Sequence, residues 1–313
     1  MDSPVLEIRG LRRRFGRVEA LKGIDLTVES PKMFGIVGPD GAGKTTLLRA
    51  ACGLLGFEAQ KFRVLEFELP RNTEALRRVL GYVPQTFSLY RNLTVDENLL
   101  LMSRLHSIPP QQFHERSERL LKINDMERFR DRLAGDLSGG MKQKLSVSCA
   151  LLPEPRLMVL DEANNGVDVI ARKEILDLVR SREDTLILWA TNYLHEAEIC
   201  DELIYMHEGR VLIQDTPRGI RERFPYSVWE VQAARPDAWL EPLDSDPRVV
   251  FFRRRGDTFS LVVKKDTPES ASPGWLDGLA PGDPPLVSHA GPDLELAFLE
   301  LVRASERPAE TTA

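Results

Sequence analysis

The nine residues GPDGAGKTT, 38 to 46, contain the spacing GxxxxGK followed by Ser or Thr, which is typical of a phosphate-binding loop. Gly38, Gly41 and Gly43 allow the backbone to curl so that successive N–H groups point at phosphate oxygens. Lys44 adds a positive charge for the β and γ phosphates, and Thr45 offers a hydroxyl ligand to Mg²⁺. A turn that merely caps a helix is the alternative. The other residues of the predicted site are Asp40, Ala42 and Thr46.

Two adjacent carboxylates, Asp161 and Glu162, end the apolar run LMVLDE at 157 to 162. Carboxylates at the end of a buried strand are unfavourable unless they are paired or bind a cation. Beside a phosphate-binding loop, the first would hold Mg²⁺ through its water shell, and the second would orient and polarise the attacking water. A helix cap or a solvated loop explains the pair equally well when it is taken alone. The upstream loop is what favours a catalytic site.

These motifs need a parallel sheet to bring them together, and the chain contains suitable strands. The apolar runs MFGIVG (33 to 38), LMVLD (157 to 161) and TLILWAT (185 to 191) are typical of buried parallel strands, and a helical stretch near 170 to 182 separates the last two. Alternating apolar and polar residues from 5 to 28 predict antiparallel strands. We therefore predict an α/β fold, a P-loop NTPase core with an antiparallel β subdomain.

Composition divides the rest of the chain. Leu, Arg and Glu recur at helical spacing from residue 86 onward, which predicts an inserted helical subdomain over about 86–152. Residues 1–222 would form the main domain. Strand-like runs and a stretch rich in Pro and Gly predict a small C-terminal α+β domain at 225–313. Its last segment, DLELAFLELVR, places three apolar residues on one helical face, Leu294, Phe298 and Leu301.

Charge and cysteine content exclude several classes of protein. The chain carries 42 Lys and Arg against 48 Asp and Glu, a net charge of -6, which argues against a dedicated nucleic-acid binder. Cys52, Cys149 and Cys200 lie far apart, so neither a zinc site nor a disulfide framework is predicted, and a reducing compartment is favoured. The start lacks a signal-peptide pattern, and no apolar run reaches the length of a membrane span. Membrane attachment is expected to go through a protein partner.

The segment LSGGMKQKLSVSCALL, 137 to 152, lies just upstream of the acidic strand. Ser138, with the backbone of Gly139 and Gly140, would form a second anion site at the start of a predicted helix. Taken alone, the segment predicts an ordinary N-capped helix. Its wording and its place in the order of motifs resemble the signature motif of the ABC transporter superfamily. The resemblance to the nucleotide-binding domains of that superfamily extends over roughly residues 5–222.

The resemblance implies roles for single residues. Phe15 in RRRFG matches the aromatic residue that stacks on adenine, although one aromatic beside a strand is more often part of a core. Gln85 in GYVPQ matches the glutamine that touches Mg²⁺ and the water while linking to the helical subdomain. Asp168 in NNGVD matches the aspartate that communicates between the two sites of a dimer. ATP and Mg²⁺ are the implied cofactors.

The resemblance also implies partners. In this family two such domains pack head to tail, and each ATP lies between the P-loop of one and the signature of the other. We expect a second ATP-binding domain, in a homodimer or heterodimer, and transmembrane permease subunits, but no nucleic acid. The expected location is cytoplasmic, on the inner face of the cell membrane. The wording of GYVPQ, LSGGMKQ and DLELAFLEL resembles the drug and lipid exporter branch.

Several positions depart from the family pattern. Ala163 and Asn164 replace Pro and Thr in DEANNGVD, and Asp40 stands where Asn or Ser is usual. Asn192 stands where the family has a switch histidine that contacts the γ phosphate; its amide can donate a hydrogen bond but cannot titrate near neutral pH. His195 follows three residues on, where a surface helix residue is expected.

These departures allow two mechanisms. In the first, the chain hydrolyses ATP slowly through Glu162. In the second, its site mainly binds ATP, while its signature completes a fully equipped site on a different partner chain. Other classes are a soluble ABC protein of translation or DNA repair and a regulatory module that binds nucleotide without turnover. A single P-loop and the lack of cysteine pairs argue against the soluble class. Copurification with a membrane protein would test that class, and a turnover assay would test the regulatory module.

Overall fold

The computed structural model describes residues 4–29, 33–163, 169–180, 184–265, 273–279 and 285–306. The chain forms two compact units that divide between Pro217 and Arg218, slightly ahead of the junction expected from composition. The short helix α8, Pro217–Glu222, contains this division. Every helix within the described ranges is too short or too polar to span a lipid bilayer.

A six-stranded sheet forms the centre of the first unit, in the order β10-β9-β3-β8-β7-β6. All neighbours are parallel except β10, which closes one edge as a hairpin with β9. Every residue of β3, β7 and β8 is buried, which confirms the three predicted parallel strands. The bounds are β3 Met33–Val37, β6 Leu80–Val83, β7 Leu157–Asp161, β8 Leu186–Thr191, β9 Glu202–His207 and β10 Arg210–Asp215.

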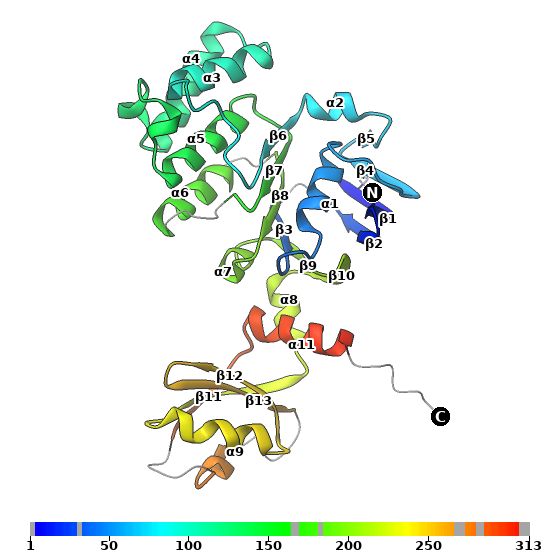
Figure 1. Cartoon of the computed structure of the whole chain (residues 1–313), viewed down its shortest axis with the longest axis vertical. Helices are drawn as coiled ribbons and strands as arrows, with labels where there is room; N and C mark the ends of the chain where they lie inside the picture. The colour runs from blue at the N-terminus through cyan, green and yellow to red at the C-terminus, as the bar shows by residue number, and fades with distance from the viewer. Residues whose placement is uncertain are drawn as a thin grey trace. The chain divides into compact units, whose positions relative to one another are not determined.

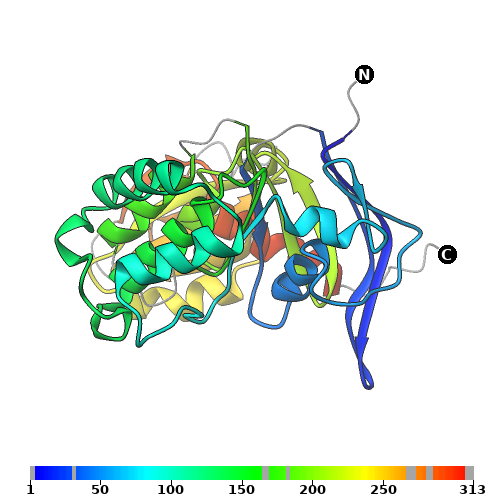
Figure 2. The same ribbon diagram turned by 90° about the horizontal axis from the view of Figure 1, so that it is seen from above.

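A smaller antiparallel sheet, in the order β2-β1-β4-β5, confirms the alternating strands predicted at the start of the chain. In Figure 2 its long β1–β2 hairpin and the inserted helices lie on opposite sides of the core. Helix α1 packs its leucines into the same apolar cluster as both sheets. The bounds are β1 Leu6–Phe15, β2 Val18–Val28, α1 Lys44–Ala51, β4 Lys61–Val64, β5 Phe67–Glu68 and α2 Thr73–Arg77.

The predicted helical subdomain lies between β6 and β7 (Figure 1). Thr94 and Glu97 form a capping box at the start of α3, and Pro110 begins α4, where its missing N–H is not needed. The bounds are α3 Val95–Leu105, α4 Pro110–Ile123, the 3₁₀ turns η1 Glu127–Phe129 and η2 Ala134–Asp136, and α5 Gly139–Leu151. Outside the subdomain, α6 Val169–Arg180 follows β7, and α7 Leu194–Ala197 follows β8.

The two faces of the central sheet bury different clusters, because side chains alternate along a strand. Leu157 and Val159 of β7 pack with α1 and the antiparallel sheet. Met158 and Leu160 pack with α3, α4, α5 and α6. Covering both faces explains why the strands are continuously apolar.

The second unit is a four-stranded antiparallel sheet in the order β12-β13-β11-β14. A helix follows the first strand and a 3₁₀ turn precedes the last, as in a split βαβ motif. Trp229, Trp239, Leu243 and Phe259 form the centre of its core. The bounds are β11 Tyr226–Gln232, η3 Pro236–Trp239, α9 Leu240–Ser245, β12 Val249–Arg255, β13 Thr258–Lys264, η4 Pro273–Leu276 and β14 Leu286–Ala290.

Helix α11, Leu294–Glu306, covers the face of this sheet opposite to α9 (Figure 1). Leu294 and Phe298 are buried as the sequence predicts, and Leu301 is half-buried. The predicted small α+β domain is therefore confirmed in its fold class.

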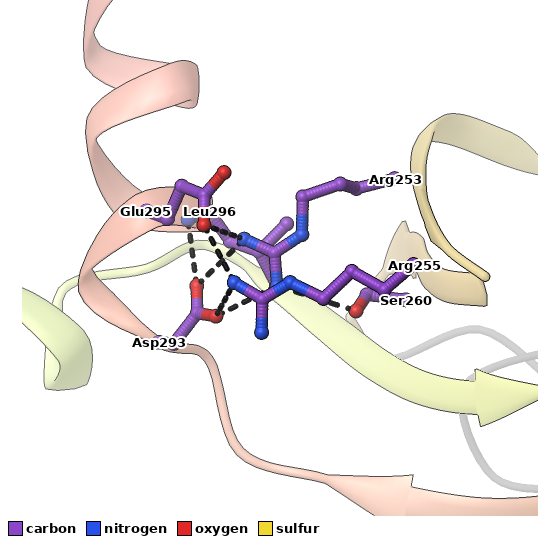
Figure 3. Close-up of polar contacts among 6 residues, drawn as sticks. All are labelled: Arg253, Arg255, Ser260, Asp293, Glu295 and Leu296. Carbon is purple, nitrogen blue, oxygen red and sulfur yellow. Dashed lines mark hydrogen bonds and ion pairs between the residues drawn. The ribbon is translucent and has the colours of Figure 1, made fainter. Parts of the chain in front are cut away.

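Charge fixes the first turn of α11 to β12. Arg253 lies 2.7 Å from carboxylate oxygens of both Asp293 and Glu295, and Arg255 lies 2.6 Å from Glu295 (Figure 3). Burial alone would raise the pKa of Asp293, but hydrogen bonds from Arg253 and from the Leu296 amide hold it below its ordinary value. The Asp293 carboxylate therefore stays ionised as a partner of the arginines.

Candidate nucleotide-binding and catalytic site

The phosphate-binding loop runs from β3 to α1 in a path that only glycine permits. A Cβ atom at Gly38 would lie 2.2 Å from the carbonyl oxygen of Met206 in β9. At Gly43, where φ is +103°, it would lie 2.7 Å from the carbonyl oxygen of Ala20 in β2. The loop therefore packs directly on the backbone of two strands.

Lys44 is buried inside the loop, with 3% of its surface exposed. Its Nζ donates to the carbonyl oxygens of Gly38 at 2.8 Å and Pro39 at 3.0 Å. It also lies 3.1 Å from a carboxylate oxygen of Glu162. An ammonium group this deeply buried requires such partners, because desolvation of a charge is costly.

Asp161 ends β7 and is fully buried. Its Oδ1 accepts a hydrogen bond from Thr45 Oγ1 at 2.7 Å, and its Oδ2 accepts one from the Tyr82 hydroxyl at 3.2 Å. Burial raises the pKa of Asp161, although both hydrogen bonds act in the opposite direction. With the amide oxygen of Gln85, these hydroxyl and carboxylate oxygens form a donor set that fits Mg²⁺.

Glu162 has a left-handed backbone, with φ of +49°, which is unusual for a residue with a side chain. Its N–H donates to the carbonyl oxygen of Ala190 in β8 at 3.1 Å. Its carboxylate accepts a hydrogen bond from Gln85 Nε2 at 2.9 Å and pairs with Lys44. Such strain costs about 1–3 kcal/mol and persists where the surroundings hold it in place.

A cavity of about 300 Å³ adjoins these side chains, near the lower end of the range for small-molecule sites. It brings together the P-loop, one strand of the antiparallel sheet and the two polar residues that follow β6 and β7. Its lining consists of Ala20, Asp40, Gly41, Ala42, Gly43, Lys44, Thr45, Thr46, Gln85 and Glu162.

The loop after β8 reaches the P-loop through a hydrogen bond from an amide to a carboxylate. Asn192 Nδ2 donates to Asp40 Oδ1 at 3.3 Å, and both residues are exposed. The carboxylate of Asp40 therefore points toward the loop of Asn192, an orientation that the sequence left open. His195 is exposed on α7, as expected.

The sequence is similar to those of known proteins. Residues 21–165 match the family model described as ABC transporter. The chain is 36% identical over 317 residues to the probable multidrug ABC transporter ATP-binding protein YbhF of Escherichia coli strain K12, covering 96% of the chain and 53% of that protein. It is 34% identical to the Nod factor export ATP-binding protein I of Rhizobium sp. strain N33, covering 75% and 79%. This chain belongs to the ABC transporter ATP-binding family.

Solved structures of the ABC family share the fold. One, described as the ATP binding subunit of an ABC transporter, has a TM-score of 0.64 and 30% identity and covers 70% of this chain and 93% of its own. The chain spans about half the length of YbhF.

Some residues predicted for the ABC site lie away from the cavity. Among the described residues that line it, none comes from 138–140. Ser138 is the N-cap of α5, where its Oγ accepts a hydrogen bond from the Met141 N–H at 3.3 Å. Phe15 ends β1, is 47% exposed, and has the Arg13 guanidinium 4.7 Å from its ring centroid. Asp168 and Asn164 lie outside the described residues.

Two contributors to the site were missed from the sequence. Tyr82 binds Asp161, and Glu196 holds the loop of Asn192 through Thr191. Tyr82 lies in the GYVPQ segment, but the pairing of its strand with β7 is seen only in the structure. Glu196 has no signal in spacing, because its burial depends on the packing of α7.

Lys44→Ala should weaken the binding of ATP with Mg²⁺ by about 30-fold or more, because it removes the buried positive charge that faces the phosphate cavity. Calorimetric titration of the purified protein measures this change. Lys61→Ala is the matched control, because Lys61 is an exposed lysine that also pairs with a glutamate, Glu7, and this variant should bind ATP as the wild type does. Unchanged affinity in Lys44→Ala would contradict the site.

Proposed function

We propose that the chain is an ATP-hydrolysing subunit that drives export through membrane-spanning subunits. The supporting observation is the contact of Glu162 with both Gln85 and Lys44 beside the P-loop cavity. A purely structural loop does not need buried charges here, because apolar residues of similar size are often at least as stable. The names of the relatives, which refer to multidrug transport and Nod factor export, support the direction of transport.

The side chains suggest a separate role for each residue of the site. Lys44 would exchange its present partners for the β and γ phosphate oxygens and stabilise the charge that develops on them. Glu162 would orient and polarise the attacking water, and Gln85 would hold its carboxylate in place. Mg²⁺, held by Thr45 and Asp161, would neutralise phosphate charge when bound.

A second ATP-binding domain would complete the site. Ser138 and Gly139 are exposed at the N-terminus of α5, where backbone N–H groups and the helix dipole favour an anion. We infer that this end contacts the γ phosphate held by the partner domain. Asp168 is proposed to communicate between the two sites, and Phe15, exposed on its hairpin, to stack on adenine.

The membrane subunit is proposed to dock in a groove of about 200 Å³ between β6 and the helical subdomain. Tyr90 and Leu105 line it and are 58% and 68% exposed. Asn98 fixes this segment, because its side chain both accepts from the Tyr90 N–H and donates to the Tyr90 carbonyl at 3.0 Å. An apolar helix here would lie a few residues from Gln85, so its movement would reach Glu162. This contact would hold the chain at the inner face of the membrane.

A second candidate is an asymmetric assembly in which this site mainly binds ATP. The contact between Asn192 and Asp40 favours it, because the amide that replaces the switch histidine is engaged with a carboxylate. The exposed signature would then serve a site on a different partner chain.

Glu162→Gln should bind ATP normally, slow hydrolysis by about 10²–10⁴-fold and accumulate an ATP-bound dimer, because only the water-polarising carboxylate is lost. Single-turnover hydrolysis and light scattering measure these effects. Glu66→Gln, at an exposed pair with Arg156, should hydrolyse ATP at the wild-type rate. Equal rates in Glu162→Gln and wild type would remove Glu162 from the catalytic role.

Leu105→Glu should release the membrane subunit while ATP binding is kept, because a charge in an apolar groove is costly to desolvate. Pull-down from solubilised membranes, with mass spectrometry, identifies the partner by its spanning helices and compares the yields. Ile123→Glu is the matched control, since Ile123 is 55% exposed in α4 but lies outside the groove. Equal recovery with both variants would place docking elsewhere.

Asn192→His should raise turnover by up to about 100-fold with little change in ATP affinity, because the added contact acts mainly on the transition state. Steady-state kcat and KM for ATP, measured with and without the partners, give the comparison. A gain seen in the isolated protein but absent from the assembled transporter supports the asymmetric assembly. No gain with the native partners would show that this loop does not limit the rate.

A further inference from the structure

A cluster of side chains around the loop of Asn192 takes no part in the chemistry proposed above. Its centre is Glu196 in α7, which is 1% exposed. Oε2 of Glu196 accepts hydrogen bonds from Thr191 Oγ1 at 2.6 Å and from Trp189 Nε1 at 3.3 Å. Its Oε1 lies 3.9 Å from the Arg172 guanidinium. A carboxylate this deeply buried is stable only with such partners.

Arg172 connects this cluster to the residue after Asn192. Its guanidinium carbon lies 4.0 Å from the centroid of the Tyr193 ring, a cation–π contact, and its side chain is 15% exposed. The Tyr193 N–H in turn donates to Thr191 Oγ1 at 2.9 Å. Both neighbours of Asn192 in the chain are therefore tied to the cluster.

The same arginine connects the loop to another element of the site. Arg172 lies near the start of α6, and α6 begins at Val169, directly after Asp168. A displacement of α6 would therefore reach Tyr193 and the loop of Asn192 through one guanidinium group. Arginine suits this task because its planar group can pair with a carboxylate and stack on a ring at the same time.

We propose that Arg172, Tyr193 and Glu196 are positioning residues that hold the loop of Asn192 against the P-loop and couple it to α6. The kinetic consequence rests on the proposed ATPase function, whereas the geometry does not. Small displacements of groups around a reacting centre can cost about 100-fold in rate. The cluster would therefore affect turnover without touching the nucleotide.

Trp189 provides a reporter that does not depend on turnover. The chain has four tryptophans, and Trp189→Phe would identify its indole N–H signal in a ¹⁵N NMR spectrum. In a Glu162→Gln background, ATP with Mg²⁺ should shift this signal, because the N–H binds Glu196. Arg172→Met should remove the ATP-dependent shift while ATP affinity, measured by calorimetry, stays within about twofold. Arg180→Met, the same change at an exposed pair on the same helix, should keep it.

Kinetics separate positioning from stability. In an Asn192→His background, Arg172→Met should lower kcat about tenfold or more with KM for ATP nearly unchanged. Tyr193→Leu should behave in the same way, whereas Tyr193→Phe keeps the ring and should retain the rate. Parallel losses of melting temperature and ATP affinity, with the kcat loss restored by cooling, would mean that the cluster is only structural and would overturn the proposal.

The outcomes also separate this proposal from the proposed function. An Arg172→Met protein that binds ATP and still shows the full shift of Trp189 overturns the positioning role. If the ATPase proposal fails instead, the parent protein will show no turnover of ATP, whether or not it binds the nucleotide. The Trp189 signal of Arg172→Met will then still differ from that of Arg180→Met without nucleotide, which supports the geometric link.

Discussion

The ion pair between Lys44 and Glu162 joins the ends of two strands that are not neighbours. β8 lies between β3 and β7, so this contact crosses the end of the strand that leads to Asn192. β3, β8, β7 and β6 run parallel, so the segments that follow them meet at the carboxyl-terminal end of the sheet. These segments are the P-loop, the loop of Asn192, the carboxylate pair and Gln85. Strand order thus determines which distant residues form the site.

Burial strengthens the electrostatic interactions among the charged side chains of the site. Lys44, Asp161 and Glu162 are each less than a tenth exposed, so electrostatic interactions among them are weakly screened by solvent. The strained backbone at Glu162 is held by its hydrogen bond to β8, which keeps the carboxylate beside the P-loop. Rigid strands on one side and bonded side chains on the other leave the carboxylate little freedom, and such preorganisation favours the transition state.

Elements with strong local patterns were predictable from the sequence. The runs that became β3, β7 and β8 are apolar along their whole length, and the P-loop spacing defines Lys44 and Thr45 without knowledge of the fold. Contacts that depend on how elements pack were not predictable. Tyr82 reaches Asp161 only because β6 lies beside β7, and Arg172 reaches Tyr193 only because α6 packs near the loop after β8. The anion site proposed at Ser138 would act on a nucleotide held by a second domain, so it depends on packing between domains.

The two departures at Asp40 and Asn192 are best understood as one feature. Asp40 adds a negative charge beside a cavity suited to phosphates, which by itself disfavours a triphosphate. Asn192 offers that carboxylate a neutral donor at 3.3 Å, so the amide is shared between Asp40 and any phosphate that enters. A histidine at 192 would meet the same carboxylate, and this negative charge would favour the protonated form of the imidazole. The Asp40 carboxylate would then compete with the γ phosphate for the imidazolium. The effect of residue 192 on hydrolysis therefore depends on the charge at residue 40.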